Sequence, residues 1–375
     1  MHKTTLPFAL AALMLGAPAM ADEQVVKIGL SGPLTGANAF AGKDNENGVR
    51  LAIEELNSKK GLAVGGKTIR FELMSEDDQG DPKAGVVVAQ KFADAGVRFV
   101  LGPYNSGVAI PASRIYNDAG IIMSTVGTNP KITQGGYRSV FRIVASDTQV
   151  GSSVANYAAK QLKLKNVGVI DDRTAFGQGI ATEFIRQAKA SGLAIAGHEF
   201  TTDKSTDFTA ILTALKAKKV DAIFFGGYAP QAAPMVRQMK QLGLNAKLLG
   251  GDTLCSPEMG KLGGDAVGDN VLCAQAGAML EKQAAGPAFQ AKYKARFKQK
   301  PDVYAAPFYD QTMFIAQAIR SVNSIDPSVV AVAMHSMSHK GVVGTYAYDQ
   351  AGNMKSSSVT IYTFKNGEPA PLASY

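Results

Sequence analysis

The sequence predicts an α/β protein made of two doubly wound parallel-sheet domains. Short apolar runs alternate with longer amphipathic segments, and such βα repeats form parallel sheets that are covered by helices. The repeats fall into two sets, one ending near residue 125 and the other beginning near residue 150. The chain has 375 residues, more than a single hydrophobic core usually accommodates. We therefore expect two lobes, each with its own sheet.

The first set of elements follows from apolar periodicity and helix-start signals. The helix expected at 42–60 places Val49, Ile53 and Leu56 on one face. The next helix opens with Asp81-Pro82, a typical helix start, and closes near Gly96. In this set we expect strands at 25–32, 67–77, 97–102 and 121–125, and helices at 42–60, 81–96 and 106–120.

The second set repeats the alternation of strand and helix. Here we expect helices at 150–162, 177–192, 207–219 and 229–243, and strands at 166–172, 193–200, 220–227 and 246–251. The last hundred residues start no third domain, because the helices expected at 287–301 and 307–323 have no strand between them. We expect these helices and a late strand at 357–367 to complete the earlier sheets.

Residues 1–21 are typical of a secretory signal peptide. Lys3 precedes an apolar core over residues 6–17, and the small residues Ala19 and Ala21 form a signal-peptidase pattern. The apolar run is shorter than the ~20 residues of a membrane span, although a retained anchor is the alternative. We expect cleavage after Ala21 and an exported, soluble chain.

Composition limits the partners and the redox compartment. The net charge is +8, and the basic residues are scattered apart from small clusters at 216–219 and 292–300, which we interpret as solvated helix surfaces because no dedicated nucleic-acid module is visible. We expect no nucleic-acid partner.

The two cysteines, Cys255 and Cys273, suggest a disulfide in an exported protein. Two buried free thiols are the alternative.

Two motifs match catalytic or cofactor patterns but lack the required context. Residues 61–68, GLAVGGKT, match a phosphate loop, yet they follow a predicted helix and precede a strand, the reverse of the functional order. We expect a Gly-rich turn there. His335 and His339 have helical spacing but no third ligand nearby. No nucleophile has a neighbouring base, so we expect no metal, no cofactor and no enzyme.

Small polar residues follow several predicted strands, where ligands bind in open parallel sheets. Ser106 and Thr128 supply amides and hydroxyls suited to one anion. Asp252 follows a strand of the second set and could pair with an ammonium group. Each of these residues could instead only cap a helix or turn. Together with nearby aromatics, they describe a site for a zwitterion with an apolar side chain.

Several segments carry a family resemblance. They are SGPLTG at 31–36, EDDQGDP at 76–82, GPYNSG at 102–107, STVGTNP at 124–130, FFGGY at 224–228 and GGDTLCSPE at 250–258. Through them the chain resembles the periplasmic branched-chain amino acid binding proteins, the soluble receptors of ABC importers with the type I periplasmic-binding-protein fold. The resemblance covers nearly all of the expected mature chain.

The resemblance implies a set of ligand-binding residues. Ser106 and Thr128 would hold the α-carboxylate, while the Val126 carbonyl, the Thr128 hydroxyl and Asp252 would accept hydrogen bonds from the α-ammonium. Tyr228 would close over the ligand. The full implied set is Tyr104, Asn105, Ser106, Val126, Gly127, Thr128, Phe176, Tyr228, Asp252 and Tyr304, in which Tyr104, Phe176 and Tyr304 line the side-chain pocket.

The resemblance also implies domain boundaries and partners. A three-strand hinge would cross near 144–147, 275–277 and 355–357. One lobe would comprise residues 22–145 plus 277–355, and the other 146–276 plus 356–375. The expected protein is a periplasmic monomer that closes over an amino acid and delivers it to a membrane permease.

Some positions depart from the family pattern and leave the ligand side chain open. Asp252 stands where a glutamate is common, Phe176 replaces a tyrosine of some members, and Ala41 falls where an aromatic is often found. The disulfide of some members would fall at Gly80 and Asn105, where this chain has no cysteine. The alternatives are a receptor for another amino acid or small organic acid, a sensory ligand-binding protein, and an exported amide hydrolase.

Overall fold

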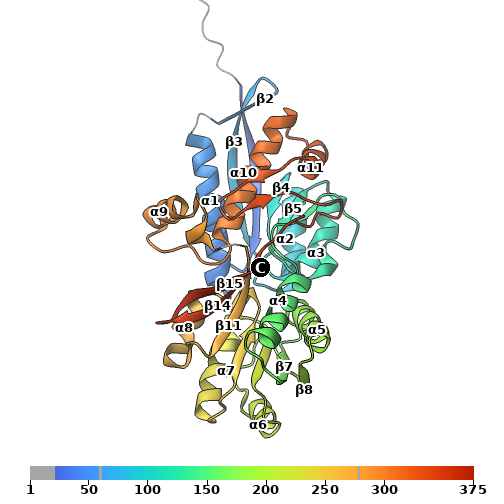
Figure 1. Ribbon diagram of the computed structural model, residues 1–375. Helices are drawn as coiled ribbons and strands as arrows, with labels where there is room; N and C mark the ends of the chain where they lie inside the picture. Colours follow the sequence, from blue (N-terminus) through green and yellow to red (C-terminus); the bar gives the residue numbers. More distant parts are fainter. Residues whose placement is uncertain (1–21, 59–60, 278) are drawn as a thin grey trace, which may run out of the picture.

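The computed structural model describes residues 22–58, 61–277 and 279–375. These residues form two lobes, one above the other, and each lobe is built around one sheet (Figure 1). The predicted fold class is confirmed. The predicted signal peptide, residues 1–21 with its cleavage after Ala21, lies outside the described residues.

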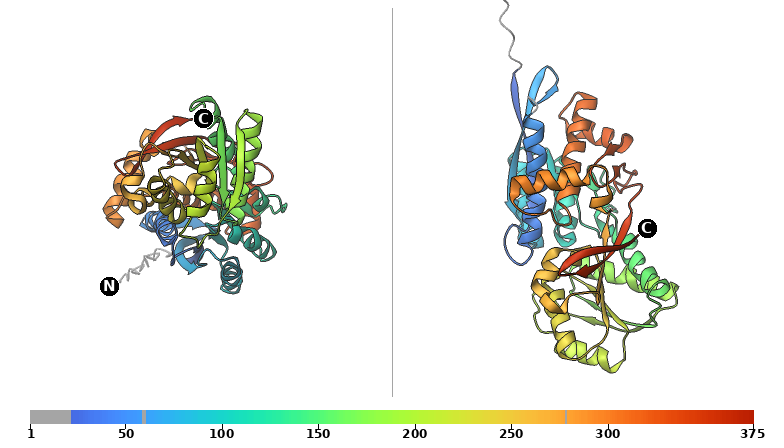
Figure 2. Two further views of the ribbon diagram at one scale, coloured as in Figure 1. Left: turned by 90° about the horizontal axis from the view of Figure 1, so that it is seen from below. Right: turned by 60° about the vertical axis from the view of Figure 1, so that its left-hand side comes forward.

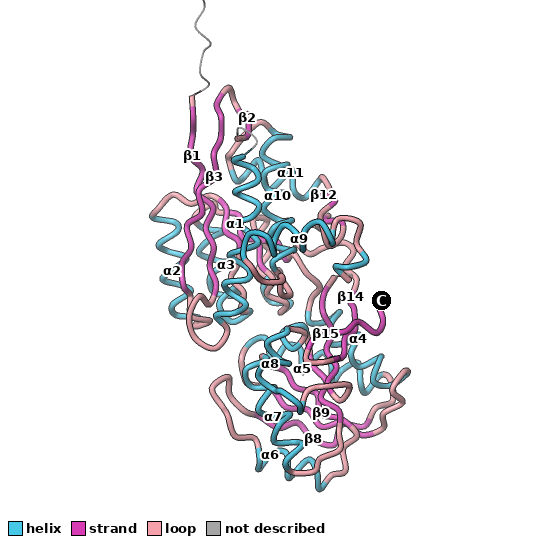
Figure 3. The backbone as a smooth tube through the Cα atoms, turned by 90° about the vertical axis from the view of Figure 1, so that its left-hand side faces the viewer, coloured by secondary structure: helices cyan, strands magenta, loops and turns pink. Residues whose placement is uncertain are grey.

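The first sheet has six strands with helices on both faces. Its spatial order is β2 (Leu62–Val64), β3 (Lys67–Asp77), β1 (Glu23–Gly32), β4 (Phe99–Leu101), β5 (Ile122–Thr125) and β6 (Val140–Arg142). Its helices are α1 (Ala39–Ser58), α2 (Pro82–Asp94), α3 (Ser106–Asp118), α9 (Gly286–Phe297), α10 (Ala305–Val322) and α11 (Pro327–Ser336). Figure 3 shows α2 and α3 on one side of this sheet and α1, α9 and α10 on the other.

The second sheet has seven strands and forms the other lobe. Its order is β15 (Glu368–Ser374), β14 (Val359–Lys365), β11 (Val271–Ala276), β10 (Lys247–Gly250), β9 (Ala222–Gly226), β7 (Asn166–Asp171) and β8 (Ala194–Phe200). The covering helices are α4 (Asp147–Lys160), α5 (Ala175–Ala190), α6 (Thr209–Ala217), α7 (Ala229–Gln241) and α8 (Pro257–Gly263). β14 completes this sheet, as the late strand was expected to do.

The sheets are parallel in their centres and antiparallel at three pairs near their edges. β2 pairs antiparallel with β3, and β14 pairs antiparallel with both β11 and β15. The turns at Gly65-Gly66 and Asn366-Gly367 are too short for the crossover that a parallel pair needs. The parallel sheets expected from the βα repeats therefore carry antiparallel pairs at these edges.

The phosphate-loop-like segment 61–68 forms a hairpin. It contains β2, the turn at Gly65 and Gly66, and the start of β3. Both turn glycines have positive φ, 57° and 78°, which favours glycine at these positions. The expectation of a simple turn between helix and strand missed β2, because three residues are too few to give a periodic pattern.

His335 and His339 do not lie on one helix, although their spacing in the sequence would allow it. α11 ends at Ser336, and His339 lies in the short strand β12 (His339–Lys340). The His335 ring hydrogen bonds to the carbonyl oxygens of Asp349 and Arg138, whereas His339 bonds to Gln317. The two rings therefore have separate structural partners.

The chain passes between the lobes three times. It leaves the first sheet after β6, leaves the second sheet after β11, and returns to the second sheet at β14. Figure 2 shows the two lobes joined at a narrow waist, with β14 and β15 next to it. Three crossings gathered at one waist are typical of lobes that hinge against each other.

The predicted disulfide is present in the structure. Cys255 follows the short helix η2 (Asp252–Leu254), and its Cα lies 5.5 Å from that of Cys273 in β11. Both cysteines are buried. The bond thus ties the loop that carries Asp252 to a strand that leads to the hinge.

Replacing both cysteines with serine is expected to lower the free energy of unfolding by about 2–4 kcal/mol, because the cross-link restricts the unfolded chain. Urea denaturation would measure the loss. A reductant should destabilise the parent protein by a similar amount and leave the double variant unchanged. A double variant as stable as the parent would contradict the prediction.

Candidate functional site

The candidate site lies where the carboxyl ends of strands from both lobes face each other. The first lobe contributes the loops after β4 and β5, and the second lobe contributes the loops after β7, β9 and β10. Because parallel strands end at the same sheet edge, residues far apart in sequence meet here. The site is therefore built from both lobes.

The two first-lobe loops are locked together by Thr125. Its hydroxyl donates to the Pro103 carbonyl at 2.6 Å and accepts from the Gly127 amide at 2.9 Å. Ser106 begins α3, and its hydroxyl accepts from the Asn129 amide at 3.3 Å. These bonds fix Ser106 and the loop containing Thr128 side by side at the start of a helix, where unpaired amides favour an anion.

Arg142 holds the loop that contains Thr128 through hydrogen bonds to its backbone. The sequence-based prediction missed this role. The side chain is 1% exposed, and its Nη1 donates to the carbonyls of Gly127 at 3.2 Å and Asn129 at 2.8 Å. Its Nη2 donates to Thr133 and Asn353. Burial lowers the Arg142 pKa to about 10, so the group stays charged at neutral pH. A charge within the apolar strand was the available sequence signal.

Asp252 is the acidic group of the second lobe. It is 1% exposed, its Oδ1 accepts from the Thr253 amide at 3.1 Å, and its Oδ2 accepts from the Tyr304 hydroxyl of the other lobe. Burial raises the Asp252 pKa to about 6, although the bonds from Tyr304 and Thr253 lower it. Thr253 also donates to the Gly227 carbonyl at 2.6 Å, which joins the loops after β10 and β9.

Aromatic rings from both lobes surround these polar groups. The ring centroid of Tyr104 lies 6.1 Å from that of Tyr228 and 5.9 Å from that of Tyr304, and Phe176 lies 5.2 Å from Tyr228. Gly177 lets the second-lobe helix α5 approach closely, because a Cβ there would lie 2.5 Å from the Gly226 carbonyl. That approach sets the position of Phe176.

A small central cavity lies between these groups. It is lined by Tyr104, Ser106, Val126, Thr128, Phe176, Tyr228, Asp252, Thr253 and Tyr304. All the predicted site residues line it except Asn105 and Gly127, and the ligand contacts of all ten stay predictions. The Gly127 amide is already bonded to Thr125. Thr253 was not predicted; it directly follows Asp252 in the quoted GGDT segment.

Contacts across the cleft hold the lobes together. The Asn129 side-chain amide donates to the Ala175 carbonyl at 2.7 Å, and the Ser256 hydroxyl donates to Asp302 at 2.6 Å. Asn129 also caps a short helix through the Lys131 amide. The sequence-based prediction missed its contact with the opposite lobe, for which the sequence offers no local signal.

The chemistry of the central cavity suits a small zwitterion. Hydroxyls and amides stand on the first-lobe side, one carboxylate stands on the second-lobe side, and aromatic rings exclude water. Within the described ranges, no group of three or more His, Cys, Asp or Glu side chains could hold a metal ion. No helix in the described part of the chain is long and apolar enough to cross a membrane.

Two hinged lobes that bury a polar cavity between them define a binding protein for a small molecule. The chain belongs to the periplasmic binding protein family, whose model matches residues 25–369. The predicted resemblance is thereby confirmed at the level of the family.

Named relatives are similar over almost the whole chain. The Leu/Ile/Val-binding protein homolog 1 of Brucella abortus (strain 2308) is 34% identical and covers 95% of this chain and 94% of its own length. The leucine-, isoleucine-, valine-, threonine-, and alanine-binding protein of Pseudomonas aeruginosa is 32% identical, covering 90% of this chain and 89% of its own. The leucine binding protein LivK of Thermotoga maritima has a TM-score of 0.86 and 27% identity, covering 93% and 98%.

Proposed function

We propose that the protein is the substrate-binding protein of an ABC importer and binds an apolar, branched-chain type amino acid between its lobes. One observation carries this proposal. The central cavity joins the donors Ser106 and Thr128 of one lobe to the Asp252 carboxylate of the other. The binding specificities printed in the names of its relatives agree with it.

The predicted residues that line the central cavity have separate roles in this proposal. Ser106 and Thr128 hold the α-carboxylate, and the Val126 carbonyl and Asp252 accept hydrogen bonds from the α-ammonium. Tyr228 covers the carboxylate from the second lobe, and aromatic rings surround the apolar side chain. In the structure the Tyr304 hydroxyl donates a hydrogen bond to Asp252. The ligand ammonium therefore competes with that hydroxyl for the carboxylate.

Affinity depends on satisfying both charged groups of the ligand. Closure removes water, which strengthens each charge pair but also imposes a desolvation penalty. A ligand without the ammonium leaves Asp252 buried and unpaired, a loss of ~2–5 kcal/mol. The closed form of the two lobes is what a membrane permease would recognise.

We also propose that the protein acts in the periplasm as a monomer, after cleavage of residues 1–21, and that it is not an enzyme. The family supports the location. Among the described residues that line the central cavity, hydroxyls occur without a histidine that could act as a base.

The lobe boundaries are also a proposal: residues 22–145 plus 277–355, and 146–276 plus 356–375. The ends of β6 at Arg142 and of β11 at Ala276 support them, because each lies just before a proposed boundary.

Calorimetric titration of refolded, ligand-free protein would test the function. We expect one-to-one binding of leucine, isoleucine or valine, and roughly 100-fold weaker binding of isocaproate, the deaminated form of leucine. Equal binding of isocaproate would contradict the role of Asp252 and indicate an organic-acid receptor. No binding of any amino acid, or turnover of the ligand, would overturn the proposed function.

A further inference from the structure

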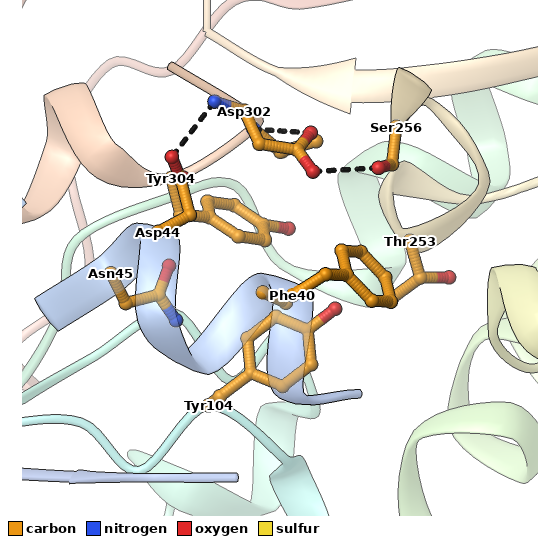
Figure 4. A pocket seen from close by; sticks show the side chains of 10 residues that line it. Phe40, Asp44, Asn45, Tyr104, Thr253, Ser256, Asp302 and Tyr304 are labelled. Carbon is orange, nitrogen blue, oxygen red and sulfur yellow. Dashed lines mark hydrogen bonds between the residues drawn. The ribbon is translucent and has the colours of Figure 1, made fainter. Parts of the chain in front are cut away.

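A second cavity lies against the central one, and we call it the side pocket (Figure 4). It is small and shares Tyr104, Thr253 and Tyr304 with the central cavity. The other residues that line it are Phe40, Ala41, Asp44, Asn45, Ser256, Asp302 and Val303. Since α1 belongs to the first lobe and Ser256 to the second, the side pocket also forms where the lobes meet.

The side chain of Asn45 places an amide oxygen without a hydrogen-bond partner among the described residues at the side pocket. The residue is 2% exposed, and its Oδ1 has no hydrogen-bond partner among the described residues. Figure 4 shows its side chain beside the rings of Tyr104 and Tyr304. Leaving a buried acceptor unpaired costs about 1–3 kcal/mol, so a ligand that donates a hydrogen bond here is favoured.

Two carboxylates lie beside Asn45 in the same pocket. Asp44 accepts from the Tyr293 hydroxyl at 2.7 Å, the Asp302 amide at 2.9 Å and the Ala305 amide at 2.9 Å, which uses most of its acceptor sites. Asp302 accepts from the Ser256 hydroxyl at 2.6 Å and from the Val303 amide at 2.8 Å. These bonds fix both carboxylates in place and leave Asp302 with further acceptor capacity, because a carboxylate offers about four lone-pair sites.

The side pocket has negative charge without a matching cation. No lysine, arginine or histidine is found among the described residues lining either cavity. Burial raises the pKa of Asp44, and burial together with the Asp44 charge raises the pKa of Asp302. Both effects reflect the penalty of burying an acid away from water, to which the nearby Asp44 charge adds in the case of Asp302.

We propose that the side pocket binds the cationic end of a basic amino acid whose α-amino and α-carboxylate groups occupy the central cavity. The inference rests on the proposed function and extends its ligand range. An ammonium group donates hydrogen bonds that the unpaired Asn45 oxygen and the remaining acceptor sites of Asp302 can accept, while the Asp44 carboxylate adds negative charge. A neutral amide would satisfy Asn45 but would leave the carboxylate charge uncompensated.

Calorimetry with lysine, norleucine and leucine tests this inference on the refolded full-length mature protein. Norleucine has the carbon chain of lysine without the terminal ammonium, so the ratio of the two affinities isolates the cation. We expect lysine to bind at least about tenfold more tightly than norleucine. Asp302→Asn should reduce that ratio, because it removes charge at nearly constant size.

Glu258→Gln is the matched control. Glu258 lies on α8 close to Asp302, pairs with Lys261 and does not line the side pocket. This variant should keep the parental ratio, which separates local pairing from a general effect of negative charge. Folding of each variant is checked by its binding of norleucine.

The outcomes distinguish this inference from the proposed function. Lysine binding no tighter than norleucine, together with tight binding of leucine, would overturn the inference and leave the proposed function intact. An unchanged ratio in Asp302→Asn would also overturn it. If leucine, norleucine and lysine all fail to bind, the proposed function itself is wrong.

Discussion

Replacing Asp252 with asparagine is expected to weaken leucine binding by roughly 100-fold. The variant removes the buried charge that faces the ligand ammonium and keeps nearly the same size. The effect should be specific to the ammonium, so isocaproate should lose much less affinity than leucine does. Calorimetry with both ligands would measure this difference.

The same substitution is expected to stabilise the ligand-free protein above pH 6. The pKa of Asp252 is raised from 3.8 to about 6 in the fold, so folding disfavours its charged form. This destabilisation develops as pH rises from about 4 to 6 and is then constant, reaching at most about 3 kcal/mol. Asp252→Asn removes it, so the variant should melt at a higher temperature at pH 7 than the parent does.

Ligand binding should show the complementary pH dependence. In the parent protein a proton competes with the ligand ammonium for Asp252, so leucine affinity should fall as pH falls through about 6. The variant should lack this part of the pH dependence. Asp265→Asn is the matched control, because Asp265 lies on the surface of the same lobe with a side chain 90% exposed. Unchanged leucine affinity in Asp252→Asn would remove this residue from the site.

Replacing Arg142 with methionine is expected to lower the free energy of unfolding by about 3–5 kcal/mol. The side chain bonds to the carbonyls of Gly127 and Asn129, and it also bonds to Thr133 and Asn353. Methionine has a similar length but no donor, so these buried acceptors would lose their partner. Thermal or urea denaturation would measure the loss.

The Arg142 substitution should also weaken leucine binding under conditions where the variant is folded. The loop that presents Val126 and Thr128 would lose its support from β6. Arg138→Met serves as the control, because Arg138 is exposed and its side chain bonds to Gln350. A stable variant that binds leucine normally would show that the loop does not depend on Arg142.

Much of the fold could be predicted from the sequence because the signals for its central elements are local. The helix from Pro82 to Asp94 begins with an aspartate cap, and Asp81 accepts from the amides of Lys83 and Ala84 as the Asp-Pro pattern indicates. The residues of β4 are fully buried, as its continuous apolar run suggests. Short elements such as β2 and β6 were missed, since three residues give too little periodicity.

The candidate site was only partly predictable. Ser106, Thr128 and Asp252 could be singled out because small polar residues follow apolar strands, and the carboxyl ends of such strands meet at one edge. Arg142 and Asn45 were not identified, because their importance lies in what they contact. The charge of Arg142 within an apolar run was a local signal but did not indicate its partners, and an asparagine in a helix has no distinctive local pattern.

The sequence by itself determined the two sets of βα units, the family and the main polar residues of the cleft, because these depend on local periodicity and short motifs. The tertiary structure alone decided how distant residues meet. Asp44 lies 258 positions from Asp302, and Arg142 lies 211 from Asn353, yet each pair is hydrogen bonded. Such contacts depend on how distant segments of the chain pack against each other. A local sequence pattern carries no information about a partner so far away in the sequence.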